Sequence, residues 1–482
     1  MRRKNSLILI ILGIISILFS LLTDTLGFGQ NGEILGAKQI LGIEFGIALI
    51  IIGIGLYTVK NENRTKITPK EIFAKILDLP VLFWVLLTFL ILYLLFFIPP
   101  LFFSEIRIQY FVKYIPDAWT TRIGFDIDTT LKHINAWLTE GTSLYADGIV
   151  PYTPLTLALF TPFLLLGYPV YYKALSLLTI FSYFLATFLF PLALSKKKEY
   201  GILILLGVSG LFSYGFQFEL ERGQFNIIAF ALVLFAIYIF HYQHKFRYFA
   251  YLFFSLALQL KLYPAIFILM LVKDWRDWKN NLKRFIALGI ANFLLLFVLG
   301  VEIFNDFIAQ IINRANMQSS RYEDLSISGF SYYLSEEAKI ISPQTADLIG
   351  KVFLFFLAIA IFAIIVHLYR QDKKGINPYL FLILTIAALM IPAASFDYKL
   401  TVLIVPMILF FNSLPTLQTL PKKLALTFTV LLTSAAYWST LYPYEVKMPF
   451  LARNSLALLV ILFALGFLYL LLKGRYENIR DS

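Results

Sequence analysis

The sequence contains no cysteine and only four histidines in 482 residues. The absence of cysteine excludes disulfide bonds, catalysis by a thiolate and metal sites with cysteine ligands. Charged residues are also scarce, at 15% of the chain, whereas a soluble domain typically carries about 25%. Because 59% of the residues are hydrophobic and 17% are aromatic, the composition excludes a soluble globular protein.

Long apolar stretches recur along the chain, and most of them approach the roughly 20 residues needed to cross a bilayer. They predict an all-α polytopic membrane protein with about twelve transmembrane helices. No internal repeat or low-complexity tract stands out, so residues 1–482 are predicted to form a single integral membrane domain. The predicted crossings are 6–22, 41–59, 80–98, 174–194, 201–218, 227–240, 285–304, 352–369, 378–394, 400–414, 424–442 and 455–472.

The positions of lysine and arginine predict the orientation, because cytoplasmic loops retain positive charge. A cytoplasmic N-terminus places 26 of the 41 basic residues in cytoplasmic segments. The first apolar stretch lacks a small-residue cleavage site, so we expect it to be retained as a span. The chain is therefore expected in the cell membrane as a multi-pass protein with both termini cytoplasmic. Its net charge of +12 is assigned to this topology and to contact with the lipid bilayer, and the scattered basic residues favour no nucleic-acid partner.

Two apolar segments do not fit the alternation of crossings. Residues 249–272 have basic residues at both ends, so a broken or re-entrant hairpin about Tyr263-Pro264 is expected. Residues 154–172 contain three prolines and are expected to form a re-entrant or surface helix on the external side. Non-crossing segments at membrane depth are tolerated where they pack in protein or line a cavity, so both indicate an internal site.

Polar residues gather in the predicted external loops, of which 99–153 and 305–351 are the larger. Three shorter external loops are expected at 219–226, 395–399 and 443–454. The polar residues in these loops are Asp126, Asp128, His133, Tyr145, Glu219, Glu221, Arg222, Gln224, Asn226, Arg314, Asn316, Arg321, Asp324, Ser326, Asp397 and Lys399.

The acids of the first loop are the candidates for catalysis at the membrane surface. A carboxylate in a partly dehydrated loop can act as a general base toward a hydroxyl group. Asp126 and Asp128 are two residues apart, so they do not share a helix face and are not expected to act identically. The competing interpretation is structural, because Asp before Thr-Thr-Leu-Lys also suits the start of a helix.

A series of short motifs between about residues 120 and 400 resembles glycosyltransferase family 87, within the GT-C class of membrane glycosyltransferases. The motifs follow the acidic loop in this order: Gly141-x-x-x-Tyr145, Pro151-Tyr152-x-Pro154, Gly223-Gln224-x-Asn226, Lys261-x-x-Pro264 and Ser326-x-x-Gly329. The resemblance implies a GT-C-like fold made of the predicted spans and the two non-crossing segments.

The same resemblance implies transfer of a hexosyl group, with mannosyl favoured, from a polyprenyl-phosphate donor to an acceptor hydroxyl. The acceptor would be a glycolipid, a glycan or another hydroxyl compound, and the transfer would occur on the external face with inversion at the anomeric carbon. The leaving lipid phosphate needs charge neutralisation more than protonation, which lysine, arginine or backbone N–H groups provide. No nucleotide-binding glycine loop is present, and no cofactor is expected.

Asp126 is the preferred base, with Asp128 as the alternative base or an orienting partner. The residues expected to bind the donor phosphate or the substrate are Lys261, Arg222, Gln224, Asn226, Tyr145, Tyr152, Arg314 and Ser326. Structural roles remain open for several of them: Lys261 could pair with a backbone carbonyl, and Gln224 and Asn226 could cap a helix. No metal site is expected from the few histidines, although carboxylates alone can bind Mg²⁺ or Mn²⁺.

A transporter or flippase of lipid-linked sugars is the alternative function, since it would also need polar groups at membrane depth and broken helices. Transporters often contain paired repeats and bury their charges midway through spans. In this sequence the acids cluster in loops instead, which favours an enzyme. An O-antigen polymerase or ligase usually relies on a late external loop rich in Arg and His, and loop 305–351 has no His.

Overall fold

The computed structural model describes residues 2–22, 37–58, 124–145, 148–194, 200–316, 324–370, 375–413, 431, 434–435 and 455–467. The regular secondary structure of these residues is entirely helical, as the composition predicts. The predicted crossing at 80–98 and the predicted loop at 443–454 lie outside the described residues, as do most of the crossing at 424–442 and the first part of loop 99–153.

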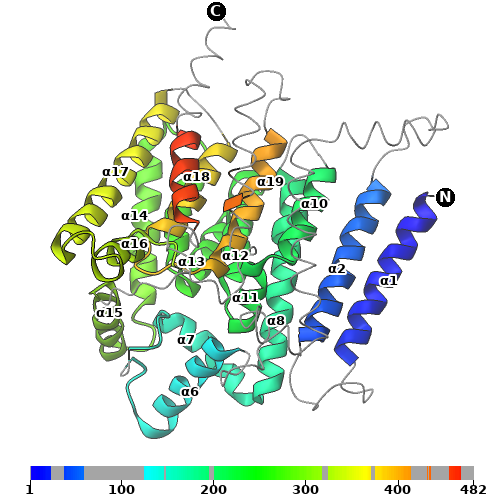
Figure 1. Cartoon of the computed structure of the whole chain (residues 1–482), viewed down its shortest axis with the longest axis horizontal. Helices are drawn as coiled ribbons and strands as arrows, with labels where there is room; N and C mark the ends of the chain where they lie inside the picture. The colour runs from blue at the N-terminus through cyan, green and yellow to red at the C-terminus, as the bar shows by residue number, and fades with distance from the viewer. Residues whose placement is uncertain are drawn as a thin grey trace, which may run out of the picture.

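Helix α12 (Asn226–Tyr242) is at the centre of the molecule (Figure 1). It is almost entirely apolar, and its side chains are buried on most sides by neighbouring helices, which is the pattern of an enclosed helix. The elements packed against it include α8 (Tyr168–Phe184), α13 (Arg247–Leu260), η5 (Tyr263–Met270) and η7 (Asp397–Leu403).

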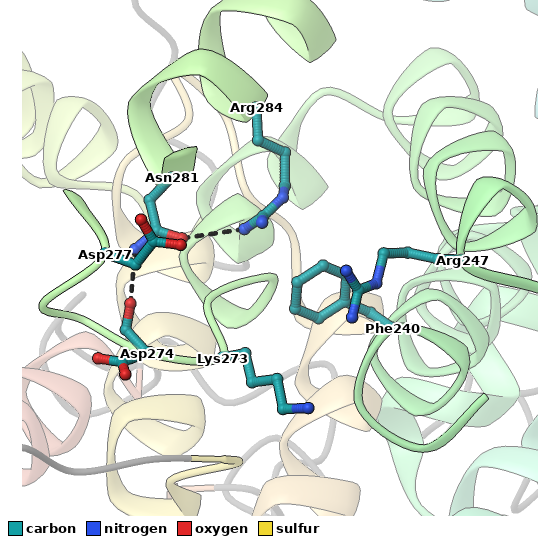
Figure 2. A pocket seen from close by; sticks show the side chains of 7 residues that line it. All are labelled: Phe240, Arg247, Lys273, Asp274, Asp277, Asn281 and Arg284. Atoms are coloured by element: carbon teal, nitrogen blue, oxygen red, sulfur yellow. Dashed lines mark hydrogen bonds between the residues drawn. The ribbon is translucent and has the colours of Figure 1, made fainter. Parts of the chain in front are cut away.

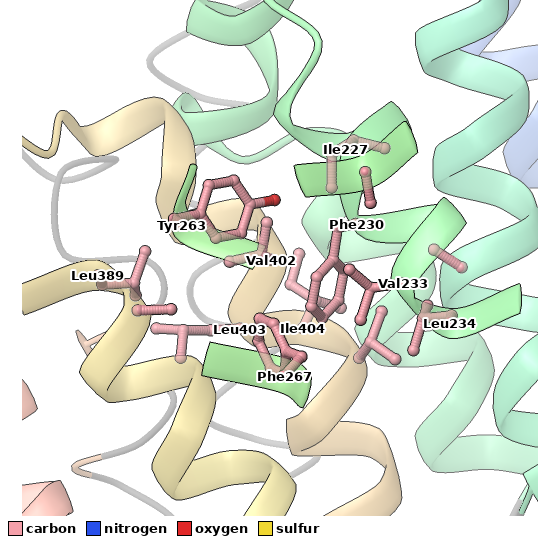
Figure 3. Close-up of a cluster of buried hydrophobic side chains, with 14 of the residues drawn as sticks. Ile227, Phe230, Val233, Leu234, Tyr263, Phe267, Leu389, Val402, Leu403 and Ile404 are labelled. Carbon is pink, nitrogen blue, oxygen red and sulfur yellow. The ribbon is translucent and has the colours of Figure 1, made fainter. Parts of the chain in front are cut away.

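Aromatic rings fill the core between α12, η5 and α18 (Pro378–Met390). The rings of Phe230 and Phe381 stack with their centroids 5.8 Å apart, and the ring of Phe267 meets both of them at 5.6 Å. Figure 3 shows Phe230 and Phe267 facing each other among aliphatic side chains. Such pairs contribute about 0.5–1.5 kcal/mol beyond the area that they bury, so this packing fixes η5 against α12.

Helices α1 (Arg2–Leu22) and α2 (Ala37–Thr58) pair at one edge of the structure, where α2 contacts α10 (Tyr200–Leu211) (Figure 1). Helix α17 (Pro343–Arg370) lies near the other edge (Figure 1). Other helices of the described residues are η3 (Leu185–Leu189), α9 (Phe190–Leu194), η4 (His244–Phe246), α14 (Trp278–Leu295) and α19 (Ile404–Ser413).

Two continuous helical stretches of the described residues are long and apolar enough to cross a membrane. Val170–Leu194 has 25 residues and Pro343–Arg370, which is α17, has 28, and they contain the predicted crossings 174–194 and 352–369. A third crossing results if α11 (Tyr214–Arg222) and α12 form one span, bent by 111° at their junction. The count of about twelve crossings therefore stays a prediction.

The two segments that did not fit the alternation are both built from short helices. Segment 249–272 is interrupted at Lys261, where the backbone is extended between α13 and η5, two residues before the expected break. Segment 154–172 contains α7 (Pro154–Phe160) and η2 (Thr161–Leu165) ahead of α8. Both interruptions agree with the sequence, while the re-entrant placement of these segments remains a prediction.

The segments expected as external loops contain helices. Loop 99–153 includes α6 (Phe125–Glu140), and α11 continues through the first part of loop 219–226. Loop 305–351 contains most of α15 (Val301–Asn316), followed by α16 (Ile327–Tyr332), η6 (Tyr333–Glu337) and the start of α17. The predicted crossing 285–304 is also interrupted, since α14 ends before Gly300 and α15 begins after it.

Candidate active site

Two glycines allow the start of α6 to lie against the end of α11. Gly124 and Gly223 have φ angles of 74° and 65°, a left-handed conformation that glycine adopts without a steric penalty. The N–H of Gly124 donates to the carbonyl oxygen of Glu221 at 2.6 Å. A Cβ on Gly223 would lie 2.7 Å from the Ile127 side chain and 3.1 Å from the Gly124 backbone, so the contact leaves no room for one.

This contact places the Asp126 carboxylate beside the polar residues that follow α11. Arg222 Nη2 donates to Asp126 Oδ1 at 2.7 Å, and Gln224 Nε2 donates to Asp126 Oδ2. The Arg222 guanidinium also lies over the ring of Phe125, 5.0 Å from its centroid. The side chains of Asp126 and Arg222 are 18% and 28% exposed, so the ion pair is reachable from solvent.

Lys261 joins this cluster from the break between α13 and η5. Its Nζ donates to Gln224 Oε1 at 2.6 Å and lies over the rings of Tyr152 and Phe225, with centroid distances of 4.6 and 4.4 Å. Gln224 therefore bridges an ammonium group and the Asp126 carboxylate through the two ends of one amide. We call Asp126, Arg222, Gln224 and Lys261 the site cluster.

Helix α7 fixes the backbone just before Lys261. The hydroxyl groups of Thr153 and Thr156 both donate to the carbonyl oxygen of Gln259, at 2.7 and 2.6 Å. Thr153 also caps α7, because its Oγ1 accepts from the N–H of Thr156 at 3.3 Å. Thr156 of segment 154–172 thus contacts segment 249–272 directly beside the site cluster.

Asp128 has different partners from Asp126. Its Oδ1 accepts from the Tyr171 hydroxyl at 2.8 Å, and its Oδ2 pairs with Lys132 Nζ at 2.8 Å, one helical turn further along α6. The Asp128 side chain is 10% exposed. Only Oδ1 therefore holds α6 against α8, since the pair with Lys132 lies within α6.

Tyr145 and Tyr152 belong to the loop that precedes α7, and α15 holds this loop in place. The Tyr145 hydroxyl donates to the carbonyl oxygen of Tyr152 at 2.7 Å. Arg314 of α15 donates through Nη2 to the carbonyl oxygen of Gly148 at 3.1 Å and to that of Ile149. Burial raises the pKa of both phenols, so both stay protonated.

Ser326 lies at the start of α16 and contacts the segment that precedes η7. Its Oγ accepts from the N–H of Gly329 at 2.9 Å as the helix cap and donates to the carbonyl oxygen of Ala393 at 3.2 Å. Asp324 Oδ1 accepts from the N–H groups of Ser326 and Ser395 at 2.9 and 2.8 Å, and burial raises its pKa. These contacts include no member of the site cluster.

Two further buried polar side chains lie where α11 meets α12. Glu219 Oε1 accepts from the N–H of Ile227 at 2.8 Å, whereas Glu219 Oε2 has no hydrogen-bond partner among the described residues. Asn226, a predicted binding residue, is fully buried, and neither atom of its amide has a partner in the described part of the chain. The sequence analysis placed Glu219 among the polar residues of loop 219–226 but did not name it as a binding residue.

The site cluster combines one carboxylate with two cations, so it can accept a proton next to groups that neutralise an anion. In the described residues, no three His, Asp or Glu side chains are grouped in a way that could hold a metal ion.

The sequence profile of glycosyltransferase family 87 matches residues 151–392. The chain belongs to glycosyltransferase family 87. Comparison with curated proteins finds no match. The family match confirms the resemblance and makes the chain a membrane glycosyltransferase. It covers three members of the site cluster, Arg222, Gln224 and Lys261, whereas Asp126 and Asp128 lie before its first residue.

Proposed function

We propose that this glycosyltransferase moves a hexosyl group, with mannosyl favoured, from a polyprenyl-phosphate donor to an acceptor hydroxyl. The observation that carries the proposal is the site cluster, where the Asp126 carboxylate shares Gln224 with the Lys261 ammonium group. A lipid phosphate needs a cation at the bond that breaks, and an acceptor hydroxyl needs a base. The cluster contains both kinds of group.

In the proposed reaction the acceptor oxygen attacks the anomeric carbon from the face opposite the phosphate. The bond between the anomeric carbon and the phosphate oxygen breaks, and its electron pair leaves with the lipid phosphate. The hydroxyl proton passes to Asp126. A single displacement of this kind inverts the configuration at the anomeric carbon.

Donor binding is expected to free the base. Arg222 pairs with Asp126 at 2.7 Å, so one oxygen of the carboxylate is occupied before the donor binds. A phosphate group competes for the same guanidinium, because arginine binds phosphate through charge-assisted hydrogen bonds. We therefore assign Arg222 and Lys261 to the donor phosphate and expect Arg222 to leave Asp126 when the donor arrives.

The other predicted residues receive supporting roles in this proposal. Asp128 orients α6 through Tyr171, and Arg314 shapes the loop that carries Tyr145 and Tyr152. Asn226 is the candidate contact for a sugar hydroxyl, since its amide is buried with no hydrogen-bond partner among the described residues. Ser326 stabilises α16 on the far side of the site.

The proposal places the site on the external face of the cell membrane and both termini in the cytoplasm, in a multi-pass chain that forms one domain. Single cysteines introduced into this cysteine-free sequence test the orientation. A membrane-impermeant thiol reagent should label Thr142→Cys in intact cells and Asn280→Cys only after permeabilisation. External labelling of Asn280→Cys would contradict the orientation.

Purified protein reconstituted in liposomes tests the reaction. We expect transfer of radiolabelled mannose from polyprenyl-phosphate mannose to acceptors in a membrane extract, and no transfer from a nucleotide-linked mannose. The NMR coupling of the product's anomeric proton should report inversion. Transfer from the nucleotide-linked sugar alone, or failure of a folded protein to bind the lipid donor, would contradict the proposal.

A further inference from the structure

A second charged region lies at the opposite end of α12 from the site cluster. It is a pocket of about 240 Å³, lined by Phe240, Arg247, Lys273, Asp274, Asp277, Asn281 and Arg284 (Figure 2). Helix α12 has 17 residues, so its two ends are separated by about 24 Å. In the proposed orientation this pocket lies on the cytoplasmic face.

Two guanidinium groups meet at one aromatic ring in this pocket. Arg247 and Arg284 lie over the ring of Phe240, at 5.2 and 4.8 Å from its centroid, and the ring is fully buried. Each contact is favourable alone, but two like charges on one ring repel each other. The arrangement therefore calls for a compensating negative charge.

Among the described residues, none of the hydrogen-bond partners of Arg247, Lys273 and Arg284 is a carboxylate. Arg284 donates to the Leu271 carbonyl at 2.7 Å and to Asn281 Oδ1 at 3.0 Å. The two ring nitrogens of His244 lie 3.1 Å from Arg247 Nη2 and 3.3 Å from Lys273 Nζ, and a neutral imidazole has one acceptor for these two donors. Among the described residues, none of the three cations forms an ion pair with a carboxylate.

The two acids of the pocket are used for local turns. Asp274 Oδ1 accepts from the N–H of Arg276 at 2.9 Å, and both oxygens of Asp277 accept from Asn280 Nδ2, at 2.9 and 3.0 Å. Figure 2 shows both acids on the Asn281 side of the pocket, away from Arg247. They leave the positive charge on the other side uncompensated.

Exposed aromatic side chains lie close in sequence to two residues of the pocket lining, Arg247 and Asp277. Phe246 is the last residue of η4, Tyr248 and Phe249 lie in the first turn of α13, and Trp278 is the first residue of α14. Each of these four side chains is more than half exposed. Aromatic residues next to basic ones are typical of the interface between a bilayer and water. This favours a ligand that is presented by the membrane itself.

We propose that this pocket binds the phosphate headgroup of an anionic lipid of the cytoplasmic leaflet, between Arg247, Lys273 and Arg284. The headgroup supplies the negative charge that the cations lack, and its acyl chains lie against the exposed aromatic residues. The bound lipid holds η4, α13 and α14 together at the end of α12 opposite the sugar-transfer site.

Binding of short-chain lipids to the full chain in neutral detergent tests this proposal by native mass spectrometry. Dioctanoyl phosphatidylglycerol should bind, and dioctanoyl phosphatidylcholine should bind much more weakly. Lys273→Gln should weaken phosphatidylglycerol binding about tenfold, the usual effect of losing a charged hydrogen bond, and the double variant Arg247→Gln/Lys273→Gln should weaken it further. Lys273 is exposed, so its single variant should fold normally.

The matched control is Lys245→Gln/Lys279→Gln, which removes two exposed cations from the same end of the molecule outside the pocket lining. Equal losses in the pocket variant and this control would overturn the proposal, as would equal binding of the two lipids. Inorganic phosphate that binds as tightly as phosphatidylglycerol would overturn the assignment to a lipid. No sugar transfer is measured, so this test fails or succeeds independently of the proposed reaction.

Discussion

The two ends of α12 hold positive charge in different ways. At the Asn226 end, Arg222 pairs directly with Asp126, and Lys261 is linked to the same carboxylate through Gln224. One carboxylate is thus shared by the two cations, so an anion that arrives must displace an existing contact. Exchange of that kind suits a substrate that binds, reacts and leaves.

At the Tyr242 end, the three cations Arg247, Lys273 and Arg284 have no carboxylate partner in the part of the chain that the structure describes. No contact between opposite charges has to break when an anion enters that pocket. A ligand that stays bound suits this arrangement better than a substrate. The position of a carboxylate relative to the cations therefore distinguishes the proposed reaction site from the proposed lipid site.

The largest effect is expected from Asp126→Asn, which keeps the shape of the side chain and removes the proton acceptor. Transfer in the reconstituted assay should fall by about 10²- to 10⁴-fold, the usual contribution of a general base, while donor binding persists. Asp128→Asn is the matched control and should lose much less. Near-normal turnover in Asp126→Asn with an inactive Asp128→Asn would identify Asp128 as the base.

Lys261→Met should weaken binding of polyprenyl-phosphate mannose by more than about tenfold, because a charged hydrogen bond to the phosphate is lost. Methionine keeps the apolar length of the side chain against Tyr152 and Phe225, so folding should be preserved. Equilibrium binding to labelled donor measures the effect, and thermal unfolding checks the fold. Unchanged donor affinity in a folded variant would return Lys261 to a structural role.

Gly223→Ala tests whether the close contact of α6 with α11 positions the base. The left-handed backbone alone costs an alanine about 1–2 kcal/mol, and the new Cβ would also meet Ile127. Gly141→Ala is the control, since Gly141 has a φ of 69° with nothing within 4 Å of its Cβ position. Transfer at matched protein levels should fall several-fold more in Gly223→Ala, and equal transfer in the two variants would show that the contact is not needed.

Tyr171→Phe should have the smallest effect. It removes the hydroxyl that donates to Asp128 and leaves a buried carboxylate oxygen with one partner fewer, which costs about 1–3 kcal/mol. The free energy of unfolding in denaturant should fall by that amount, with transfer by the folded protein little changed. A loss of transfer as large as that of Asp126→Asn would make Asp128 part of the chemistry.

The sequence identified the class, the family and the segments that form the site. Asp126, Arg222, Gln224 and Lys261 were all chosen from loops or breaks, and they lie together because such segments converge at one end of the helices. Hydrophobic length and charge are local properties, so they predicted helices and interruptions well. The family match confirms the resemblance that the motifs suggested.

The sequence analysis did not predict which distant segments pack against each other. Arg314 was expected near the phosphate, but its donors bind carbonyl oxygens of a loop 166 and 165 residues earlier, a partner choice that no local pattern encodes. The roles of Gly124 and Gly223 depend on two helix ends that meet in space. The last four residues of α11, 219–222, were expected as a loop because their polar side chains masked the helical pattern that tertiary contacts stabilise.

A structure with polyprenyl-phosphate mannose bound would test most directly the central claim, that sugar transfer occurs at the site cluster. We expect the phosphate within hydrogen-bond reach of Arg222 and Lys261, with Arg222 withdrawn from Asp126 and the anomeric carbon facing that carboxylate. A phosphate bound between Arg247 and Lys273 instead, with the Asp126 and Arg222 pair intact, would contradict the claim that sugar transfer occurs at the Asn226 end of α12.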